Sequence, residues 1–251
     1  MRWDPSCYGA YADHRLRPGL ELMSRIAIEP ALVYDLGCGT GELTHYLSQR
    51  WPGAKVIGID NSLEMVSRAQ PSANVRFLRQ DIEDWRPESA PDLIFSNAAL
   101  HWVADHKSLF PRLLDQLSPE GVLAIQMPDN WDEPTHVVID QEISRRGWGT
   151  RLEGHILHHP VAGIDQYLTW LAAASQIDAW RTTYYQAMSG IDPVLTWVRG
   201  SVLVPVRAVL TEEEFGSLET ALAAKYRTAY PPQPDGSTLM PMSRLFLVAR
   251  R

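Results

Sequence analysis

Three alternating glycines follow an acidic residue in the first fifth of the chain. Asp35 lies at the end of an apolar run, and Gly37, Gly39 and Gly41 come directly after it. Glycine lacks a Cβ atom, so this turn can adopt positive φ angles and bring its main chain close to a ligand. The next stretch predicts a helix whose N-terminus would face that ligand. The pattern therefore indicates a nucleoside-binding surface made of main-chain atoms.

The spacing of these glycines bears on which nucleoside is bound. A dinucleotide turn carries glycines at its first, third and sixth positions, and counting from Gly37 the sixth position is Glu42. Asp35 could accept a hydrogen bond from an ammonium group, whereas it would repel a pyrophosphate. A ligand with a cationic or zwitterionic end is therefore favoured, and the NAD interpretation is weakened without being excluded.

Polar residues also end the next three runs that have strand character. Asp60 ends a β-branched run, Asp81 ends the following one, and Asn97 ends a fourth. Ligands of an open parallel sheet lie outside the carboxyl ends of its strands, so these residues and Asp35 are expected to line one cleft. In that cleft Asp60 is placed to accept hydrogen bonds from ribose hydroxyls.

The elements that must position these residues follow a regular order. Strand and helix patterns alternate as far as a fifth strand at residues 121–128, and strand character returns at residues 179–188 and 245–249. The sequence thus predicts an α/β fold, a Rossmann-like seven-stranded and mostly parallel sheet with helices on both faces. We expect one domain over residues 1–251, with a helical cap at residues 129–175 inserted after the fifth strand.

Composition limits the classes of partner. The 251 residues carry a net charge of −7, which argues against a nucleic-acid surface because phosphate contacts need clustered Lys and Arg. No stretch is apolar over the length of a membrane span, and the first residues lack the apolar core of a signal peptide. We therefore expect a cytoplasmic protein that acts on a small molecule, with no nucleic-acid or membrane partner and with Cys7 and Cys38 as free thiols. The oligomeric state stays open.

The four strand-end motifs, in this order, resemble the class I S-adenosylmethionine-dependent methyltransferases over about the first half of the chain. The resemblance implies that S-adenosylmethionine is the cofactor, with Asp35 holding its methionine part, Asp60 its ribose and Asp81 approaching its adenine amine. A non-catalytic α/β domain with acids at solvated strand ends is the alternative. The other cofactor contacts that the resemblance implies are Gly37, Gly39, Gly41, Asn61, Met65, Ile82, Asn97, Ala98 and Trp102.

The acceptor must be specified by residues outside these motifs. Arg and tryptophan N–H groups are donors suited to carboxylates, and an Arg fork can hold a carboxylate in bidentate fashion. Such residues occur in expected loops at Trp131, at Trp197 with Arg199, and at His101 beside Trp102. A polyanionic acceptor is therefore a candidate, although a single tryptophan is more often part of a packed core or cap.

Further segments extend the resemblance to nearly the whole chain and narrow it to the trans-aconitate 2-methyltransferase family. This family implies methyl transfer to one carboxylate of trans-aconitate, a small tricarboxylate, to give a monomethyl ester and S-adenosylhomocysteine. Residues 147–160 depart from the family pattern. The segments that carry the resemblance are residues 3–8, 15–18, 126–136, 180–185 and 244–251.

The implied reaction needs no general base, because a carboxylate is already ionised at neutral pH. Catalysis would come from holding the carboxylate oxygen, the methyl carbon and the sulfur nearly in line, which can lower a barrier by roughly 7–11 kcal/mol. Cationic and N–H donors must offset the desolvation of a trianion. We expect Arg199 to be the main acceptor anchor. The other expected positioning residues are Trp131, Tyr8, Trp197 and, near the reacting groups, His101.

Two rival functions stay open. One is methyl transfer to another acceptor, such as a different small carboxylic acid, a phenol or a carboxylate on a carrier protein. The other is binding of the cofactor without any transfer. No metal is expected, because His155, His158 and His159 have no nearby cysteine and form no helical pair four residues apart.

Overall fold

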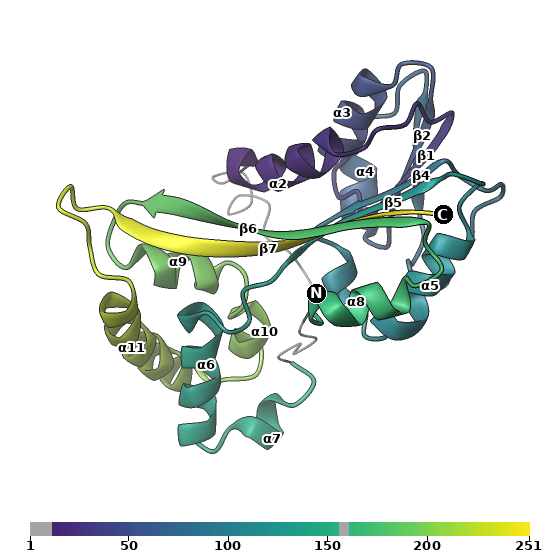
Figure 1. The fold of residues 1–251 in the computed structure, drawn as a ribbon. Coiled ribbons are helices and arrows are strands. Elements are labelled where there is room, and N and C mark those ends of the chain that lie inside the picture. Colours follow the sequence, from purple (N-terminus) through teal and green to yellow (C-terminus); the bar gives the residue numbers. More distant parts are fainter. Residues whose placement is uncertain (1–11, 156–160) are drawn as a thin grey trace. The chain divides into compact units, whose positions relative to one another are not determined.

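The computed structural model describes the backbone of residues 12–155 and 161–251, and the side chains of these residues from 16 onward (Figure 1). Expectations for Cys7, Tyr8, His158 and His159 lie outside the described residues. The chain forms two compact units. The first, called the sheet unit, contains Asp13–Pro128, Val161–Thr182 and Arg244–Arg251. The second, called the helical unit, contains the described residues of Met1–Ala12, Asp129–Pro160 and Thr183–Ser243.

The strands form a seven-stranded sheet in the order β3-β2-β1-β4-β5-β7-β6. The pairs β1–β2, β1–β4, β2–β3 and β4–β5 are parallel, and β7 runs antiparallel to β5. This confirms the predicted Rossmann-like, mostly parallel sheet. The strands are β1 (Leu32–Leu36), β2 (Lys55–Asp60), β3 (Val75–Arg79), β4 (Leu93–Asn97), β5 (Val122–Pro128), β6 (Gln176–Met188) and β7 (Thr238–Arg250).

Helices separate most of the strands, as the alternating pattern predicted, but among the described residues no helix lies between β3 and β4. The sheet unit contains α2 (Ala12–Ser24), α3 (Glu42–Arg50), α4 (Leu63–Arg68), η1 (Leu100–Trp102), α5 (His106–Asp115) and α8 (Ile164–Trp170). The helical unit contains α6 (Pro134–Arg145), α7 (Gly149–Leu152), α9 (Pro193–Arg199), α10 (Val204–Arg207) and α11 (Glu212–Ala229).

Helices of the sheet unit cover both faces of its strands. Successive strand residues point to opposite faces. On one face Tyr34 of β1 belongs to a buried cluster that includes α5 and α8, two helices that lie next to each other in Figure 1. On the other face Thr44 of α3 bonds to the adjacent strand residue, Asp35. α2 lies on this second face as well, because a Cβ atom at Gly19 would stand 3.3 Å from Asn97 Cγ of β4.

The helical unit has a buried cluster of its own, in which Ile139 and Ile143 of α6 pack with Leu218 and Leu222 of α11. α11 begins at a capping box, since the Thr211 hydroxyl accepts from the main-chain N–H of Glu214 and the Glu214 carboxylate accepts from that of Thr211. The unit is therefore organised around its own apolar core.

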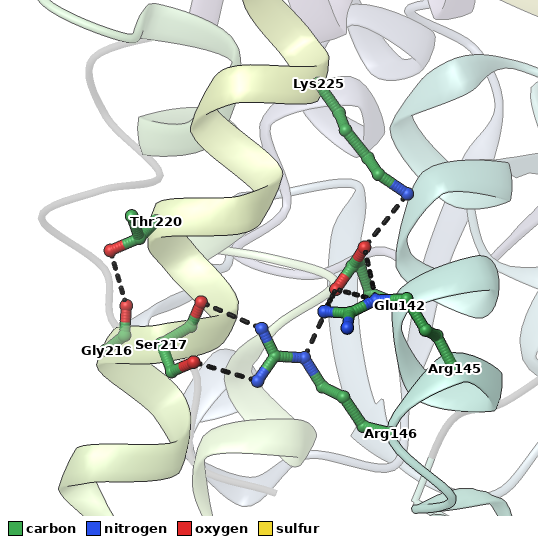
Figure 2. Close-up of polar contacts among 7 residues, drawn as sticks. All are labelled: Glu142, Arg145, Arg146, Gly216, Ser217, Thr220 and Lys225. Atoms are coloured by element: carbon green, nitrogen blue, oxygen red, sulfur yellow. Dashed lines mark hydrogen bonds and ion pairs between the residues drawn. The ribbon is translucent and has the colours of Figure 1, made fainter.

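A charged cluster also joins α6 to α11 (Figure 2). The side chain of Glu142 is 2% exposed and accepts hydrogen bonds from Arg145 and Arg146, while Lys225 of α11 pairs with it at 2.9 Å. Arg146 also donates to the hydroxyl and carbonyl oxygens of Ser217 on α11. One buried carboxylate thus pairs with three cations: Arg145 of α6, Arg146 at the C-terminal cap of α6, and Lys225 of α11.

The expected cap at residues 129–175 differs in extent from the helical unit. α6 and α7 belong to that unit, but α8 belongs to the sheet unit, because Tyr167 is buried against α5. Residues 183–243 instead supply α9, α10 and α11. The expectation of one domain with an inserted cap stays a prediction. None of the helices described is both long and apolar enough to cross a membrane.

Candidate functional site

The glycine turn between β1 and α3 has the backbone that its sequence predicts. Gly37, Gly39 and Gly41 have φ angles of 78°, 56° and 86°. A Cβ atom would stand 2.0 Å from Ala99 Cβ at Gly37 and 2.4 Å from the Phe77 ring at Gly41, so glycine allows close packing at both positions. At Gly39 no described atom lies within 4 Å of the Cβ position. The main chain of Gly39 therefore borders open space that a ligand can occupy.

Asp60, at the end of β2, holds this turn in place. One carboxylate oxygen accepts from the N–H of Gly39 at 2.9 Å, and the other accepts from the N–H of Ser62 at 2.9 Å. A carboxylate has about four acceptor sites, so these two bonds leave capacity for ribose hydroxyls. The structure thus brings Asp60 to the turn, and its contact with ribose stays a prediction.

Asp35 lies beneath the turn and is 2% exposed. The Thr44 hydroxyl of α3 donates to it at 2.6 Å. Burial raises the pKa of Asp35 to about 7; the Thr44 hydrogen bond opposes this shift, and the negative charge of Asp60 adds to it. A positively charged ligand nearby would favour the ionised form. Asp35 therefore connects β1 to α3, and direct contact with the ligand's ammonium group stays a prediction.

The third strand end brings two predicted cofactor residues together. The Asn61 side chain donates to the Asp81 carboxylate at 3.1 Å, and the other Asp81 oxygen accepts from the N–H of Glu83. Met65 lies in the first turn of α4, where its N–H donates to the hydroxyl of Ser62. Ile82, next to Asp81, packs against the buried cluster of the sheet unit. These contacts position the segments expected to face the ribose and the adenine.

The end of β4 combines backbone strain with an unsatisfied polar atom. Ala98 has a φ of 52°, which is unfavourable for a residue with a Cβ atom, and such strain often marks functional sites. The buried Oδ1 of Asn97 has no hydrogen-bond partner within the described chain. Buried acceptors are normally satisfied, so a donor such as an ammonium group fits this position. Together with the open space at Gly39, Asn97 suits a ligand with a zwitterionic end.

His101 and Trp102 follow in η1, with their rings 4.7 Å apart. Burial lowers the pKa of His101 to about 3, and the charges of Arg244 and His106 act in the same direction. The His101 ring is therefore neutral at physiological pH, and its Nδ1 has no partner among the described residues. Trp102 is 44% exposed. Neither residue supplies a positive charge to this edge of the sheet.

A hydrogen-bond chain that the sequence did not predict supports η1. His106 Nε2 donates to the carbonyl of Leu100 at 2.8 Å. The Tyr167 hydroxyl lies 2.7 Å from His106 Nδ1 and accepts from the N–H of Ala162. A carbonyl only accepts, so His106 carries a proton on Nε2. No local motif predicts this chain, because α8 is far from η1 in sequence.

Known relatives identify the family. Residues 33–121 match the model of a methyltransferase domain. Trans-aconitate 2-methyltransferase of Shigella dysenteriae serotype 1 is 42% identical over 257 residues, which cover 99% of this chain and 98% of the relative. The Escherichia coli O17:K52:H18 protein of the same name is 43% identical, with 99% and 98% covered. The chain belongs to the trans-aconitate 2-methyltransferase family. It is an S-adenosylmethionine-dependent methyltransferase, and S-adenosylmethionine is its cofactor.

The fold of this family member also occurs in more distant proteins. The YcgJ protein of Bacillus subtilis, known from a crystal structure, is 17% identical and superimposes with a TM-score of 0.60, covering 95% of this chain and 98% of that protein. At this identity the similarity concerns the fold alone.

The predicted acceptor residues of this trans-aconitate 2-methyltransferase family member are distributed over both units. His101 belongs to the sheet unit, Trp131, Trp197 and Arg199 belong to the helical unit, and Tyr8 lies outside the described residues. Their contact with an acceptor stays a prediction.

In the helical unit the structure gives each of these residues a local environment. Arg199 Nε contacts Glu219 of α11 at 2.5 Å, and the Arg199 side chain is 45% exposed. Trp197 is partly buried and packs against the apolar cluster of the unit. Such a packing role is the alternative that the sequence left open for a single tryptophan. The Trp131 ring lies 5.0 Å from that of His136. Of the three predicted acceptor residues in this unit, Arg199 is the one that carries a positive charge, and its side chain is partly exposed.

No metal centre is evident in the part of the chain that the structure describes, where no three His, Cys, Asp or Glu side chains are arranged to hold an ion. The expectation of no metal stays a prediction, because His158 and His159 lie outside this part. Cys38 is a free thiol inside the glycine turn. Burial raises its pKa, with the charges of Asp35 and Asp60 adding to the effect, so the thiol is protonated at neutral pH.

Proposed function

We propose that this chain transfers the methyl group of S-adenosylmethionine to one carboxylate of trans-aconitate, giving a monomethyl ester and S-adenosylhomocysteine. The observation that carries the choice of acceptor is the 42% identity to relatives named for this reaction, which extends through both units. The strand-end geometry of the sheet unit supports the transfer chemistry. A cytoplasmic location stays part of the proposal.

The residues proposed to hold the cofactor come from the four loops at the carboxyl ends of β1 to β4. The open space at Gly39 admits the nucleoside, and the unpaired Oδ1 of Asn97 accepts from its ammonium group. When bound, S-adenosylmethionine supplies a methyl group on a positively charged sulfur. The remaining proposed contacts are Asp35, Gly37, Gly41, Asp60, Asn61, Met65, Asp81, Ile82, Ala98 and Trp102.

The residues around the acceptor have to bind and orient it. A carboxylate is ionised at neutral pH, so no residue is needed as a general base. His101 is suited to binding and orienting the acceptor, because burial lowers its pKa to about 3 and leaves it a neutral hydrogen-bonding group. Positioning of the acceptor carboxylate, rather than proton transfer, is therefore the contribution of these residues.

Arg199 is proposed as an anchor for an acceptor carboxylate. Its Nε is occupied by Glu219, while its two terminal nitrogens make no hydrogen bond within the described chain. Two terminal N–H groups in a plane can hold a carboxylate in bidentate fashion. Trp131, Trp197 and Tyr8 are proposed as further positioning residues, and they rest on the sequence alone.

A product assay tests the proposed function. The purified chain is incubated with S-adenosylmethionine carrying a labelled methyl group and, in parallel, with trans-aconitate, cis-aconitate, citrate or isocitrate, followed by mass spectrometry of the esters. We expect a monomethyl ester from trans-aconitate in clear preference to the other acids. An ester of a different acid would support the rival acceptor, and binding of S-adenosylhomocysteine without any product would support a non-catalytic binding protein.

A further inference from the structure

β7 carries an arginine whose direction is set by the pleat of the sheet. Leu245 and Leu247 belong to the buried cluster that contains α5 and α8, so they point to that face. Arg244 and Phe246 alternate with them and point to the other face. There the Phe246 ring stacks on the Trp180 ring at 4.8 Å. Arg244 therefore lies on the face covered by α2 and α3, the same face as Asp35.

The strand register places Arg244 at the carboxyl edge of the sheet. Arg244 lies opposite Pro128, the last residue of β5, and Phe246 lies opposite Gln126. Gln126 in turn is the register partner of Asn97, at the end of β4. Residues opposite each other in neighbouring strands share a face. Asn97, Gln126 and Phe246 thus form a row along one face, and Arg244 lies on the same face two residues farther toward the carboxyl edge, beside the loops proposed to hold the cofactor.

Two buried polar groups in this row and beside it lack partners. Gln126 is 1% exposed, and its Nε2 has no hydrogen-bond partner among the described residues. His101 lies in η1, the short helix that follows β4. It is 8% exposed, and its Nδ1 likewise has no hydrogen-bond partner among the described residues. Buried donors are rarely left unsatisfied in folded proteins. An amide N–H, an imidazole nitrogen and a guanidinium at one edge form a donor set with a positive charge.

We propose that Arg244, Gln126 and His101 form the binding site for a carboxylate of the acceptor. Arg244 provides the charge, Gln126 donates through Nε2, and the neutral ring of His101 adds a hydrogen bond. The inference rests on the proposed function, since it concerns the acceptor of that same reaction. It adds Arg244 and Gln126 to the acceptor residues expected from the sequence, and it assigns His101 to one carboxylate of the acceptor.

The test measures binding of trans-aconitate to protein saturated with S-adenosylhomocysteine, by titration calorimetry, for the wild type and for Arg244→Gln. A charged hydrogen-bond partner is removed, so we expect the Kd for trans-aconitate to rise roughly tenfold to a hundredfold. The Kd for S-adenosylhomocysteine should change less than about twofold, because Arg244 is assigned to the acceptor. Arg244→Lys should recover part of the affinity by restoring the charge.

Arg250 offers a matched control. It lies on the same strand and the same face as Arg244 but opposite Val122, at the other end of β5, where it pairs with Glu120 at 2.8 Å. Arg250→Gln should leave both Kd values unchanged. Gln126→Met keeps the side chain's size and removes its amide, and it should weaken trans-aconitate binding without weakening S-adenosylhomocysteine binding.

The outcomes separate this inference from the proposed function. An unchanged Kd for trans-aconitate in Arg244→Gln, or equal losses of both ligands, would overturn the site. Wild-type protein that binds trans-aconitate but forms no ester would disprove the proposed reaction. The Arg244→Gln titration would still test the proposed binding site in that case. Wild-type protein that does not bind trans-aconitate would overturn both.

Discussion

At the scale of single residues, Asp35 should make cofactor binding depend on pH. Burial raises its pKa to about 7, so the carboxyl group is largely protonated below this pH and ionised above it. The ammonium group of the cofactor prefers the ionised form. We therefore expect the Kd for S-adenosylhomocysteine to fall as the pH rises from 6 to 8, measured by calorimetry.

The matched variant is Asp35→Asn, which keeps the side chain's shape and cannot ionise. It should bind S-adenosylhomocysteine more weakly at pH 8 and show little pH dependence over the same range. A wild-type Kd that stays constant from pH 6 to 8 would contradict a role for the Asp35 charge in cofactor binding.

The three glycines of the turn should also differ from one another when replaced. A Cβ at Gly39 would enter open space, whereas a Cβ at Gly37 would stand 2.0 Å from Ala99. Gly39→Ala should therefore fold with a modest loss of stability, about 1–2 kcal/mol for its positive φ, and bind the cofactor more weakly. Gly37→Ala should lower the melting temperature much more. Equal melting temperatures of Gly39→Ala and Gly37→Ala, measured by calorimetry, would contradict this distinction.

At the scale of elements, the Glu142 cluster connects α6 to α11 (Figure 2). Hydrogen bonds from Arg145, Lys225 and Arg146 lower the pKa of Glu142 to about 2, although its burial opposes this. Glu142→Gln should lower the free energy of unfolding by roughly 1–3 kcal/mol, below the range for a fully buried pair because Arg145 and Lys225 are partly exposed. Urea unfolding at pH 7 measures this.

The same cluster predicts the direction of the pH dependence. The pKa of Glu142 is lower in the folded than in the unfolded chain, so its contribution is fully present above the unfolded value of about 4.5. The contribution is lost as the pH falls from there towards about 2. As a control, Glu64→Gln removes an exposed pair with Arg68 and should cost less than about 1 kcal/mol. Equal effects of the two variants would contradict the role of burial.

At the scale of the whole molecule, the residues proposed for the cofactor belong to the sheet unit, whereas those proposed for the acceptor are distributed over both units. The glycine turn and the strand ends belong to the sheet unit, and Arg199 belongs to the helical unit. Arg199→Ala should raise the KM for trans-aconitate about tenfold or more through the loss of a charged hydrogen bond, with the Kd for S-adenosylhomocysteine unchanged. Asp60→Ala should instead raise the Kd for S-adenosylhomocysteine and leave the KM for trans-aconitate nearly unchanged.

A control for Arg199 exists within the same unit. Arg227 of α11 is also exposed and pairs with Asp192 at 2.6 Å, and the proposal gives it no ligand. Arg227→Ala should leave the KM for trans-aconitate unchanged. If Arg199→Ala behaves like this control, Arg199 is not an acceptor anchor.

The sequence by itself determined the parts of this protein that depend on short stretches of chain. The positive φ angles of the glycine turn, the polar residues at strand ends and the seven strands all follow from patterns a few residues long. Such patterns reflect local backbone preferences and the alternation of side chains, which act before any long-range contact forms. They were also sufficient to identify the methyltransferase family.

The tertiary structure decided which distant residues share one edge of the sheet. Arg244 meets the end of β5 because β7 runs antiparallel to it, and α8 joins the sheet unit because Tyr167 packs against α5. These placements depend on long-range pairing and on burial of apolar surface, which no short segment records. The sequence therefore predicted the cofactor side of the site from its motifs, whereas Gln126 and Arg244 emerged only once the strands were paired.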